Sequence, residues 1–253
     1  MSSEHSFWHA RYQQQAGWTL NTRRYIFGQI GISLDDRLIE VGSGSGAVLE
    51  SLARDGYAHL CGIDLDLAAL LDAKIAHPNI CADGMSLPFS NASFSHSMCH
   101  FFLLWVSDPL IALQEMARVT KPGGWVLALA EPDYGGRISC PDALERLADL
   151  QTRALAHQGA DIHMGRRLIS LFTEIGLEDI FVGIIPAQCG GNAQPNAFLQ
   201  DRDILNRDLA GLIDQEEFEA LVCQAEKGSS ENESMWFVPI FYAFGQVPRD
   251  KTG

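Results

Sequence analysis

The hydrophobic positions of the chain fall into short apolar runs that alternate with amphipathic segments over residues 35–135. Apolar runs of this length are typical of buried strands, and the segments between them have the spacing of helices. Their alternation predicts right-handed βαβ units and a parallel sheet. The pattern predicts strands over 37–41, 59–63, 80–81, 94–99 and 125–130, and helices over 47–55, 68–76 and 109–119.

The two ends of the chain lack the regular alternation of strands and helices seen over residues 35–135. Residues 5–30 are predicted to be helical, with large aromatic side chains as anchors. Pro239 lacks an N–H to donate, so it favours an edge or bulge position for its part of the final strand. After residue 135 the pattern predicts helices over 142–157 and 165–175, a strand over 180–185, a helical insertion over 193–227 and a final strand over 236–245.

The segment between the first strand and the first helix of the alternating region carries a candidate binding loop. Glu40 lies near the end of the strand, and Gly42, Gly44 and Gly46 follow at alternate positions. Glycine permits φ > 0 and close approach of a ligand, and the helix offers N–H groups and a positive dipole end to an anion. The turn predicts a nucleotide-type site. A dinucleotide loop has the spacing GxGxxG, whereas here the third glycine comes one residue early.

Charge and composition narrow the range of partners. The chain has 18 basic and 32 acidic residues, a net charge of −14 and a pI near 4.8. An acidic surface repels nucleic acid and anionic membranes, so neither is expected as a partner. The short basic pair Arg166–Arg167 is expected to flank a helix.

The six cysteines show neither a CxxC pair nor a zinc-type spacing with histidines, so no metal site and no disulfide framework are expected. Buried thiols in a reducing compartment explain them better. The first residues lack the basic and apolar regions of a signal peptide. The longest apolar run is far below the ~20 residues that cross a bilayer. These features favour a cytoplasmic protein.

Four further features lie in register with the glycine-rich turn. Asp64 follows the second strand, the segment 82–89 (ADGMSLPF) follows the third, Lys121–Gly124 (KPGG) precedes the fifth, and aromatic residues fill the final strand. Together they resemble the class I S-adenosylmethionine-dependent methyltransferases, and more narrowly the small-molecule group similar to the ubiquinone and menaquinone C-methyltransferases. The resemblance covers residues 35–135 well and the last ten residues loosely.

The resemblance implies a Rossmann-like, doubly wound α/β fold: a mostly parallel seven-stranded sheet with an antiparallel terminal strand and helical insertions forming a lid. It also implies S-adenosylmethionine as the cofactor and a small-molecule substrate. We expect one methyltransferase domain over 1–253, comprising a helical N-terminal cap (1–30), a cofactor-binding core (35–135), substrate-side helices and an insertion (136–230) and the terminal strand (231–247).

On this resemblance the glycine-rich turn holds the methionine end of the cofactor. Glu40 sits where the family's acid bonds, directly or through water, to the amino-acid portion. Burial of an unpaired carboxylate in an apolar strand would cost several kcal/mol, which favours this ligand role. Gly42, Ser43 and Gly44 would pass beneath that portion and the ribose, and Gly46 completes the turn.

The resemblance places the adenosine end of the cofactor at the ends of the second and third predicted strands. Asp64 would hold the ribose hydroxyls, and Leu65 would pack on one face of the adenine. Asp83 would accept from the adenine amino group, with Gly84 and Met85 framing the base. The alternative for the two aspartates is that they are solvated loop carboxylates.

Candidates for proton removal follow the fourth and fifth strands, at the sheet edge where ligands bind in open α/β folds. His100 is the leading catalytic candidate, because an imidazole titrates near neutral pH; the alternative is that it lines the cofactor pocket. Glu131, Asp133 and Tyr134 could orient an amine or hydroxyl, or act as turn residues. His163 could reach the site from a lid, although a surface position is the simpler interpretation.

The N-terminal segment is rich in side-chain amides and aromatics. In similar enzymes such a segment folds over the cofactor. Tyr12 and Trp18 could then shield the donor methyl, and Thr19 or Arg23 could meet the cofactor carboxylate. Plain helix packing is the alternative. Leu104–Trp105 stands where many relatives have paired histidines, which hints at an aromatic or aliphatic acceptor.

Three functions remain open on the sequence. The first is methyl transfer to a small, largely apolar or aromatic molecule through an oxygen, nitrogen or carbon atom. The second is a regulatory protein that binds S-adenosylmethionine without catalysis, since no single residue is decisive for catalysis. The third, an NAD(P)-dependent oxidoreductase, is disfavoured by the glycine spacing and by the segments 87–89 and 122–124. The sequence leaves the oligomeric state open.

Overall fold

The computed structural model describes residues 3–73, 77–185, 201–230 and 235–249. The chain forms two compact units. The first comprises Met1–Glu131, Gly165–Ile185 and Phe241–Gly253, and the second comprises Pro132–Met164 and Pro186–Ile240. Within the described ranges, no helix is both long and apolar enough to cross a membrane.

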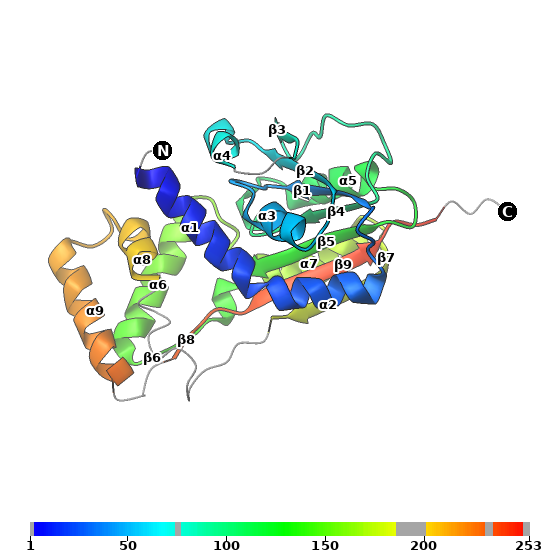
Figure 1. The fold of residues 1–253 in the computed structure, drawn as a ribbon. Coiled ribbons are helices and arrows are strands. Elements are labelled where there is room, and N and C mark those ends of the chain that lie inside the picture. The colour runs from blue at the N-terminus through cyan, green and yellow to red at the C-terminus, as the bar shows by residue number, and fades with distance from the viewer. Residues whose placement is uncertain (1–2, 74–76, 186–200, 231–234, 250–253) are drawn as a thin grey trace. The chain divides into compact units, whose positions relative to one another are not determined.

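A seven-stranded sheet forms the centre of the first unit, in the order β3-β2-β1-β4-β5-β9-β7 (Figure 1). β1 is parallel to β2 and β4, and β9 is antiparallel to β7. The predicted α/β fold, with a mostly parallel sheet and one antiparallel strand, is confirmed. The strands are β1 (Arg37–Val41), β2 (His59–Asp64), β3 (Asn79–Cys81), β4 (His96–Cys99), β5 (Trp125–Pro132), β7 (Glu178–Ile184) and β9 (Ile240–Gln246).

Helices cover both faces of this sheet. In Figure 1, α2 and α3 lie in front of the strands, and α5 and α7 lie behind them. A short 3₁₀ helix, η1 (Leu103–Trp105), follows β4. The helices are α1 (Ser3–Trp18), α2 (Leu20–Ile30), α3 (Ala47–Arg54), α4 (Leu67–Asp72), α5 (Pro109–Val119) and α7 (Met164–Glu174).

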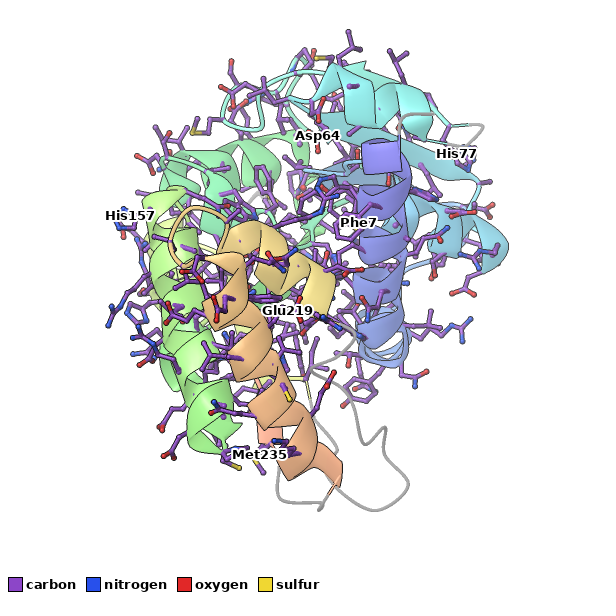
Figure 2. All side chains as sticks on the ribbon, turned by 90° about the vertical axis from the view of Figure 1, so that its left-hand side faces the viewer. Phe7, Asp64, His77, His157, Glu219 and Met235 are labelled. Atoms are coloured by element: carbon purple, nitrogen blue, oxygen red, sulfur yellow. The ribbon has the colours of Figure 1, made fainter. Side chains whose placement is uncertain are left out.

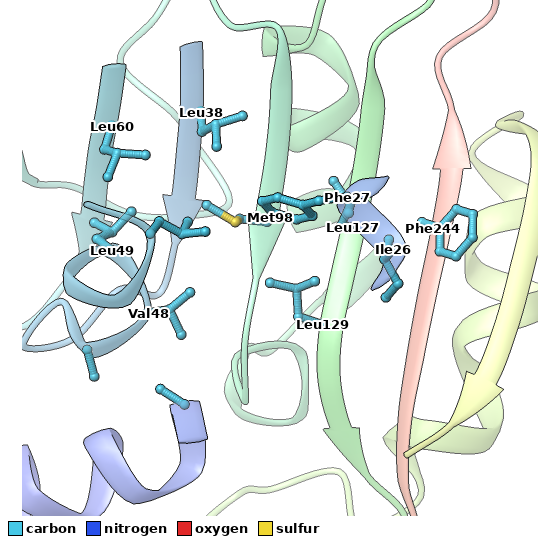
Figure 3. Packing of buried hydrophobic residues seen from close by; sticks show 13 residues of the cluster. Ile26, Phe27, Leu38, Val48, Leu49, Leu60, Met98, Leu127, Leu129 and Phe244 are labelled. Atoms are coloured by element: carbon cyan, nitrogen blue, oxygen red, sulfur yellow. The ribbon is translucent and has the colours of Figure 1, made fainter. Parts of the chain in front are cut away.

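The apolar face of α3 anchors the glycine-rich turn. Val48 and Leu49 belong to the same core cluster as Leu38 of β1 and Leu60 of β2 (Figure 3). All four side chains are at most 3% exposed, and full burial of each contributes about 1.5–3 kcal/mol. Because the strand before the turn and the helix after it are both held by this core, the turn between them has a defined position.

The second unit is mainly helical. β6 (Ile138–Cys140) pairs antiparallel with β8 (Met235–Phe237) in a separate two-stranded sheet. Figure 2 shows α6, which ends at His157, beside α9, which carries Glu219, and apolar side chains of both helices form one core. The helical elements are η2 (Tyr134–Gly136), α6 (Asp142–His157), α8 (Arg202–Asp208) and α9 (Gln215–Ser230).

The single final strand predicted over 236–245 is wrong. The segment is divided between β8 in the small sheet and β9 in the large sheet, and Pro239 lies between them. Proline cannot donate to a ladder and fixes φ, so regular pairing stops there. The partner of β8, β6, was not predicted.

Three further boundaries differ from the prediction. The helical region 5–30 is two helices, with Thr19 between them. The strand predicted from residue 94 begins at His96, and Phe94 makes only a single bridge to Thr120. The helix predicted over 68–76 is described over Leu67–Asp72. Residues 74–76 and 193–200 of the predicted elements lie outside the described residues.

Candidate functional site

The glycine-rich turn has the backbone that its sequence predicts. Gly42, Gly44 and Gly46 have φ of 75°, 51° and 78°, values that residues with a Cβ rarely adopt. The N–H of Gly44 donates to Asp64 Oδ2 at 2.7 Å, and the N–H of Ser43 donates to the carbonyl of Ile63 at 2.9 Å. These bonds join the tips of β1 and β2 and bring Asp64, labelled in Figure 2, to the turn.

Glu40 is a buried carboxylate with an unsatisfied atom. The residue is 2% exposed, and its Oε2 has no hydrogen-bond partner among the described residues. Burial raises the pKa of Glu40 to about 8; the Arg23 guanidinium opposes this shift and Asp64 adds to it. Buried polar atoms without a partner are rare in native structures. The ligand role predicted for Glu40 would give this atom a partner.

Arg23 is the positively charged counterpart of Glu40, and it is 1% exposed. Its Nη1 donates to Thr19 Oγ1 at 2.9 Å and its Nη2 to Ser51 Oγ at 2.8 Å, whereas its Nε has no partner in the described part of the chain. Burial lowers the pKa of Arg23, and the charge of Glu40 opposes the shift. An acid and a base thus share this interior, and each keeps one unsatisfied polar atom.

His100 belongs to the same group of side chains. Its Nε2 lies 3.1 Å from Thr19 Oγ1, and the residue is 9% exposed. Burial, followed by the nearby charge of Arg23, lowers the pKa of His100 to about 3. The imidazole is therefore neutral at physiological pH. The structure brings together Thr19, Arg23 and His100, three residues that the sequence analysis singled out.

The N-terminal helix α1 passes beside the turn. A Cβ on Gly44 would lie 3.2 Å from the Tyr12 ring, and burial, followed by the charge of Asp64, raises the pKa of Tyr12. The Trp18 ring is 39% exposed and meets the Phe101 ring edge-on, with 6.4 Å between centroids. Tyr12 therefore contacts the glycine-rich turn, while Trp18 contacts the segment after β4.

The residues expected around the adenine lie at the tips of β2 and β3. Leu65 is 73% exposed, which leaves an apolar face open to a ligand. Asp83 Oδ1 accepts from the N–H of Met85 at 2.8 Å and closes a tight turn around Gly84. A Cβ on Gly84 would lie 2.6 Å from the tip of the Phe102 ring. This close approach explains glycine at position 84.

Two roles were considered for Glu131, and its contacts agree with the structural one. It is fully buried, and its carboxylate accepts from the backbone N–H groups of Phe102, Leu103 and Leu104. Burial raises the pKa of Glu131 to about 7, while these three donors oppose the shift. Both carboxylate oxygens are engaged by the chain itself. This geometry does not support the suggestion that Glu131 orients an amine or hydroxyl.

Asp133, Tyr134 and His163 lie in the second unit. His163 Nδ1 is 3.5 Å from Asp133 Oδ1, and the side chains are 45% and 3% exposed. The N–H of Tyr134 donates to the carbonyl of Ile162 at 2.8 Å, which joins the segment after β5 to the segment before α7. Because the Nδ1 atom of His163 is itself buried, the exposed part of the imidazole is the opposite edge.

Several contacts of the site were not predicted. His9 Nδ1 lies 2.8 Å from Ser45 Oγ in the turn, Ser51 receives Arg23, and the Phe102 ring lies against Gly42. Each contact joins residues far apart in the chain. Periodicity and spacing carry no signal for such pairs, because side-chain packing between elements decides them.

Known proteins resemble this chain in sequence and in fold. Residues 39–128 match the family model described as a methyltransferase domain. The demethylmenaquinone methyltransferase of Corynebacterium urealyticum is 36% identical over 115 residues, which cover 45% of this chain and 47% of that protein. The chain spans about half the length of the first curated relatives it matches.

Two solved structures share the fold. A presumed methyltransferase from an antibiotic biosynthesis pathway of Anabaena variabilis has a TM-score of 0.68 and 13% identity, covering 90% of this chain and 97% of that one. Phosphoethanolamine N-methyltransferase 2 of Haemonchus contortus, solved with phosphomonomethylethanolamine and S-adenosylhomocysteine, has a TM-score of 0.57 and 16% identity, covering 90% of this chain and 53% of that one. The matched family segment contains all the predicted site residues between positions 40 and 100.

Proposed function

We propose that this protein, which carries a domain of the methyltransferase family over residues 39–128, transfers a methyl group from S-adenosylmethionine to a small molecule. The fold supports this, since the glycine-rich turn and the tips of β2 and β3 lie at the carboxyl edge of the sheet, where ligands bind in open α/β folds. The acceptor is small and largely apolar or aromatic, and its reacting atom is an oxygen, nitrogen or carbon.

The observation that carries the proposal is the pair of unsatisfied atoms on Glu40 and Arg23. A carboxylate oxygen without a donor and a guanidinium N–H without an acceptor complement a zwitterion, which bears both an ammonium and a carboxylate. The amino-acid end of S-adenosylmethionine is such a group. NAD(P) has none, so the same observation disfavours an oxidoreductase.

The residues at the strand tips fit the remainder of that cofactor. Asp64 would accept from the ribose hydroxyls, Leu65 would cover one face of the adenine, and Asp83, Gly84 and Met85 would frame the base. Ser43 and the three glycines of the turn would pass beneath the ligand, with Tyr12 and Trp18 above it. These assignments rest on the burial, contacts and positive φ angles of the free protein.

The bound cofactor supplies a sulfonium methyl group that is already strongly electrophilic. The task of the chain is then to align the acceptor with it and to exclude water, which together can supply about 7–11 kcal/mol. Partly buried aromatic side chains at the turn, such as Tyr12, suit the exclusion of water. No described group of three or more His, Cys, Asp and Glu side chains is arranged to hold a metal ion.

An acceptor that loses a proton as it attacks needs a base. His100 stays a candidate for contact with the reacting groups, but its pKa of about 3 makes it a weak base in the free protein. His163 lies in the second unit, where its Nδ1 is 3.5 Å from the buried Asp133 carboxylate, and its role stays a prediction from the sequence.

The broader assignments belong to the same proposal. We place acceptor specificity in residues 136–230, as one part of a single methyltransferase domain with a helical lid. We also place the protein in the cytoplasm, since the described cysteines form no disulfides. Neither nucleic acid nor a membrane is proposed as a partner, because the net charge of −14 repels both.

Titration calorimetry with S-adenosylmethionine, S-adenosylhomocysteine and NADH tests the cofactor. The first two should bind and NADH should not; binding of NADH alone would reject the proposal. Transfer of a radiolabelled methyl group to a panel of phenols, quinols, amines and carboxylic acids tests catalysis. Cofactor binding without transfer to any acceptor would favour the alternative, a regulatory protein that only binds S-adenosylmethionine.

A further inference from the structure

The turn after β4, residues 100–104, is held by a carboxylate from a neighbouring strand. Glu131, near the end of β5, is fully buried. Its Oε1 accepts from the N–H groups of Phe102 (3.1 Å) and Leu103 (2.9 Å), and its Oε2 accepts from the N–H of Leu104 (3.2 Å). The thiol of Cys99 donates to Oε1 as well, at 3.9 Å. One side chain thus satisfies three consecutive backbone donors.

These donors would otherwise have no partner. They lie at the start of η1, where N–H groups lack acceptors within the helix, and the residue before η1, Phe102, makes no side-chain cap. Phe101 has φ of 52°, a left-handed conformation that a non-glycine residue keeps only when its surroundings hold it. The Glu131 carboxylate therefore stabilises a turn that its own sequence disfavours.

The turn places three aromatic rings around the predicted cofactor residues. His100 contacts Thr19, and Phe101 contacts Trp18. The Phe102 ring spans from Gly42 to Gly84: a Cβ on Gly42 would overlap it, and a Cβ on Gly84 would lie 2.6 Å from its tip.

The tip of the Phe102 ring lies on the inner side of the site. A Cβ on Gly84 would also lie 2.8 Å from Val41 Cγ1, and Val41 is fully buried at the end of β1. The ring therefore fills the gap between β1 and the turn 83–85, with part of its surface exposed. A ring in this position lies beneath a ligand that reaches from the glycine-rich turn to Gly84.

We propose that Glu131 is a positioning residue of the cofactor site, and that Phe102, which it holds through the backbone, forms the apolar floor beneath the adenosine. The inference rests on the proposed function, since it names the surface that the adenosine of S-adenosylmethionine contacts. Glu131 itself touches no ligand. It acts by keeping the Phe102 ring against Gly42 and Gly84.

Calorimetric titration with S-adenosylhomocysteine tests both residues. Glu131→Gln replaces one acceptor oxygen by an NH₂ group, which faces a backbone donor and cannot accept from it. Phe102→Ala removes the floor. We expect each variant to raise the Kd about tenfold, the usual size of an aromatic contact of this kind. An unchanged Kd for Phe102→Ala would refute the assignment of Phe102 as the floor beneath the adenosine.

Thr120→Val is a matched control for lost stability. In the first unit, Thr120 Oγ1 donates to Met116 O at 2.7 Å and lies 2.9 Å from Ser97 Oγ, and the residue is 2% exposed. This variant also loses buried hydrogen bonds, but it touches no residue of the turn after β4. It should melt earlier than the wild type and bind S-adenosylhomocysteine with the same Kd. A tenfold loss in this control would show that any destabilisation weakens binding, and would overturn the inference.

The double variant Glu131→Gln/Phe102→Ala decides whether Glu131 acts through Phe102. If it does, the double variant should bind no more weakly than Phe102→Ala alone, because the ring that Glu131 positions is already absent. Fully additive losses would overturn this link. Should Glu131→Gln fail to fold, Phe102→Leu against Phe102→Ala tests the floor, and leucine should recover most of the affinity. Failure of the wild type to bind would refute the proposed function itself.

Discussion

Replacement of Glu40 by glutamine separates the stability of the free protein from its affinity for the cofactor. Burial raises the pKa of Glu40 from 4.5 to about 8. Because the pKa of Glu40 is higher in the folded protein than in the unfolded chain, folding favours the protonated form. Below about pH 4.5 the side chain is protonated in both states, so Glu40 does not lower the free energy of unfolding there. The penalty of this residue grows as the pH rises and levels off above about pH 8. At pH 7 the difference of about 2.5 pH units corresponds to about 3 kcal/mol.

Glutamine keeps the shape of the side chain and cannot ionise, so Glu40→Gln should stabilise the free protein above pH 4.5. A gain of about 3 kcal/mol corresponds to a rise in Tm of about 6–12 °C at pH 7 for a protein of this size. At pH 4.5 the two proteins should melt at nearly the same temperature. The same change should weaken binding of S-adenosylmethionine by about 1.5–3 kcal/mol, because a charged hydrogen bond to the ligand is lost.

Thermal unfolding at pH 4.5, 7 and 8, with calorimetric titration of each protein, measures both effects. Arg23, whose charge acts on Glu40, offers the competing explanation. If Glu40 were ionised and paired with Arg23 in the free protein, glutamine would lower the Tm at pH 7 and 8. That result would refute the reasoning, as would a variant that binds S-adenosylmethionine as tightly as the wild type.

Asp64→Ala should weaken S-adenosylmethionine binding by about 1.5–3 kcal/mol and also lower the Tm, since Asp64 accepts from the N–H of Gly44; an unchanged Kd in calorimetry would count against the ribose assignment. Gly42→Ala should melt earlier and lose cofactor binding, whereas Gly31→Ala, at a similar φ of 72° but with open space around it, should melt earlier and keep it. Equal binding by both glycine variants would show that the Phe102 contact is unimportant.

The part of the site that could be predicted is the part that local rules determine. Glu40, Gly42 and Asp64 lie where apolar strands end, and the carboxyl ends of parallel strands meet at one edge of a sheet. Once the alternation of strands and helices is read, these residues must come together. The positive φ of the glycines follows from the same turn, because a strand that passes directly into a helix needs residues that tolerate it.

The remainder depends on contacts between distant segments. Phe102 reaches Gly42 and Gly84 only because Phe101 takes a left-handed φ of 52°, and that conformation depends on a carboxylate from another strand. The break at Pro239 has a local cause, but only tertiary packing decides that β8 pairs with β6. Hydrophobic periodicity reports which face of an element is buried and carries no information about its partner.

Glu40 and Glu131 show most clearly what the sequence cannot distinguish. Both acids lie near the end of an apolar strand, both are buried, and burial raises both pKa values, to about 8 and about 7. Three backbone N–H groups reach Glu131, whereas one oxygen of Glu40 is left without a donor. A carboxylate satisfied by its own chain stabilises the fold, and one left unsatisfied destabilises it until a ligand arrives. The unsatisfied atom, rather than the raised pKa, is therefore the reason for which we propose Glu40 as the acid that binds the ligand.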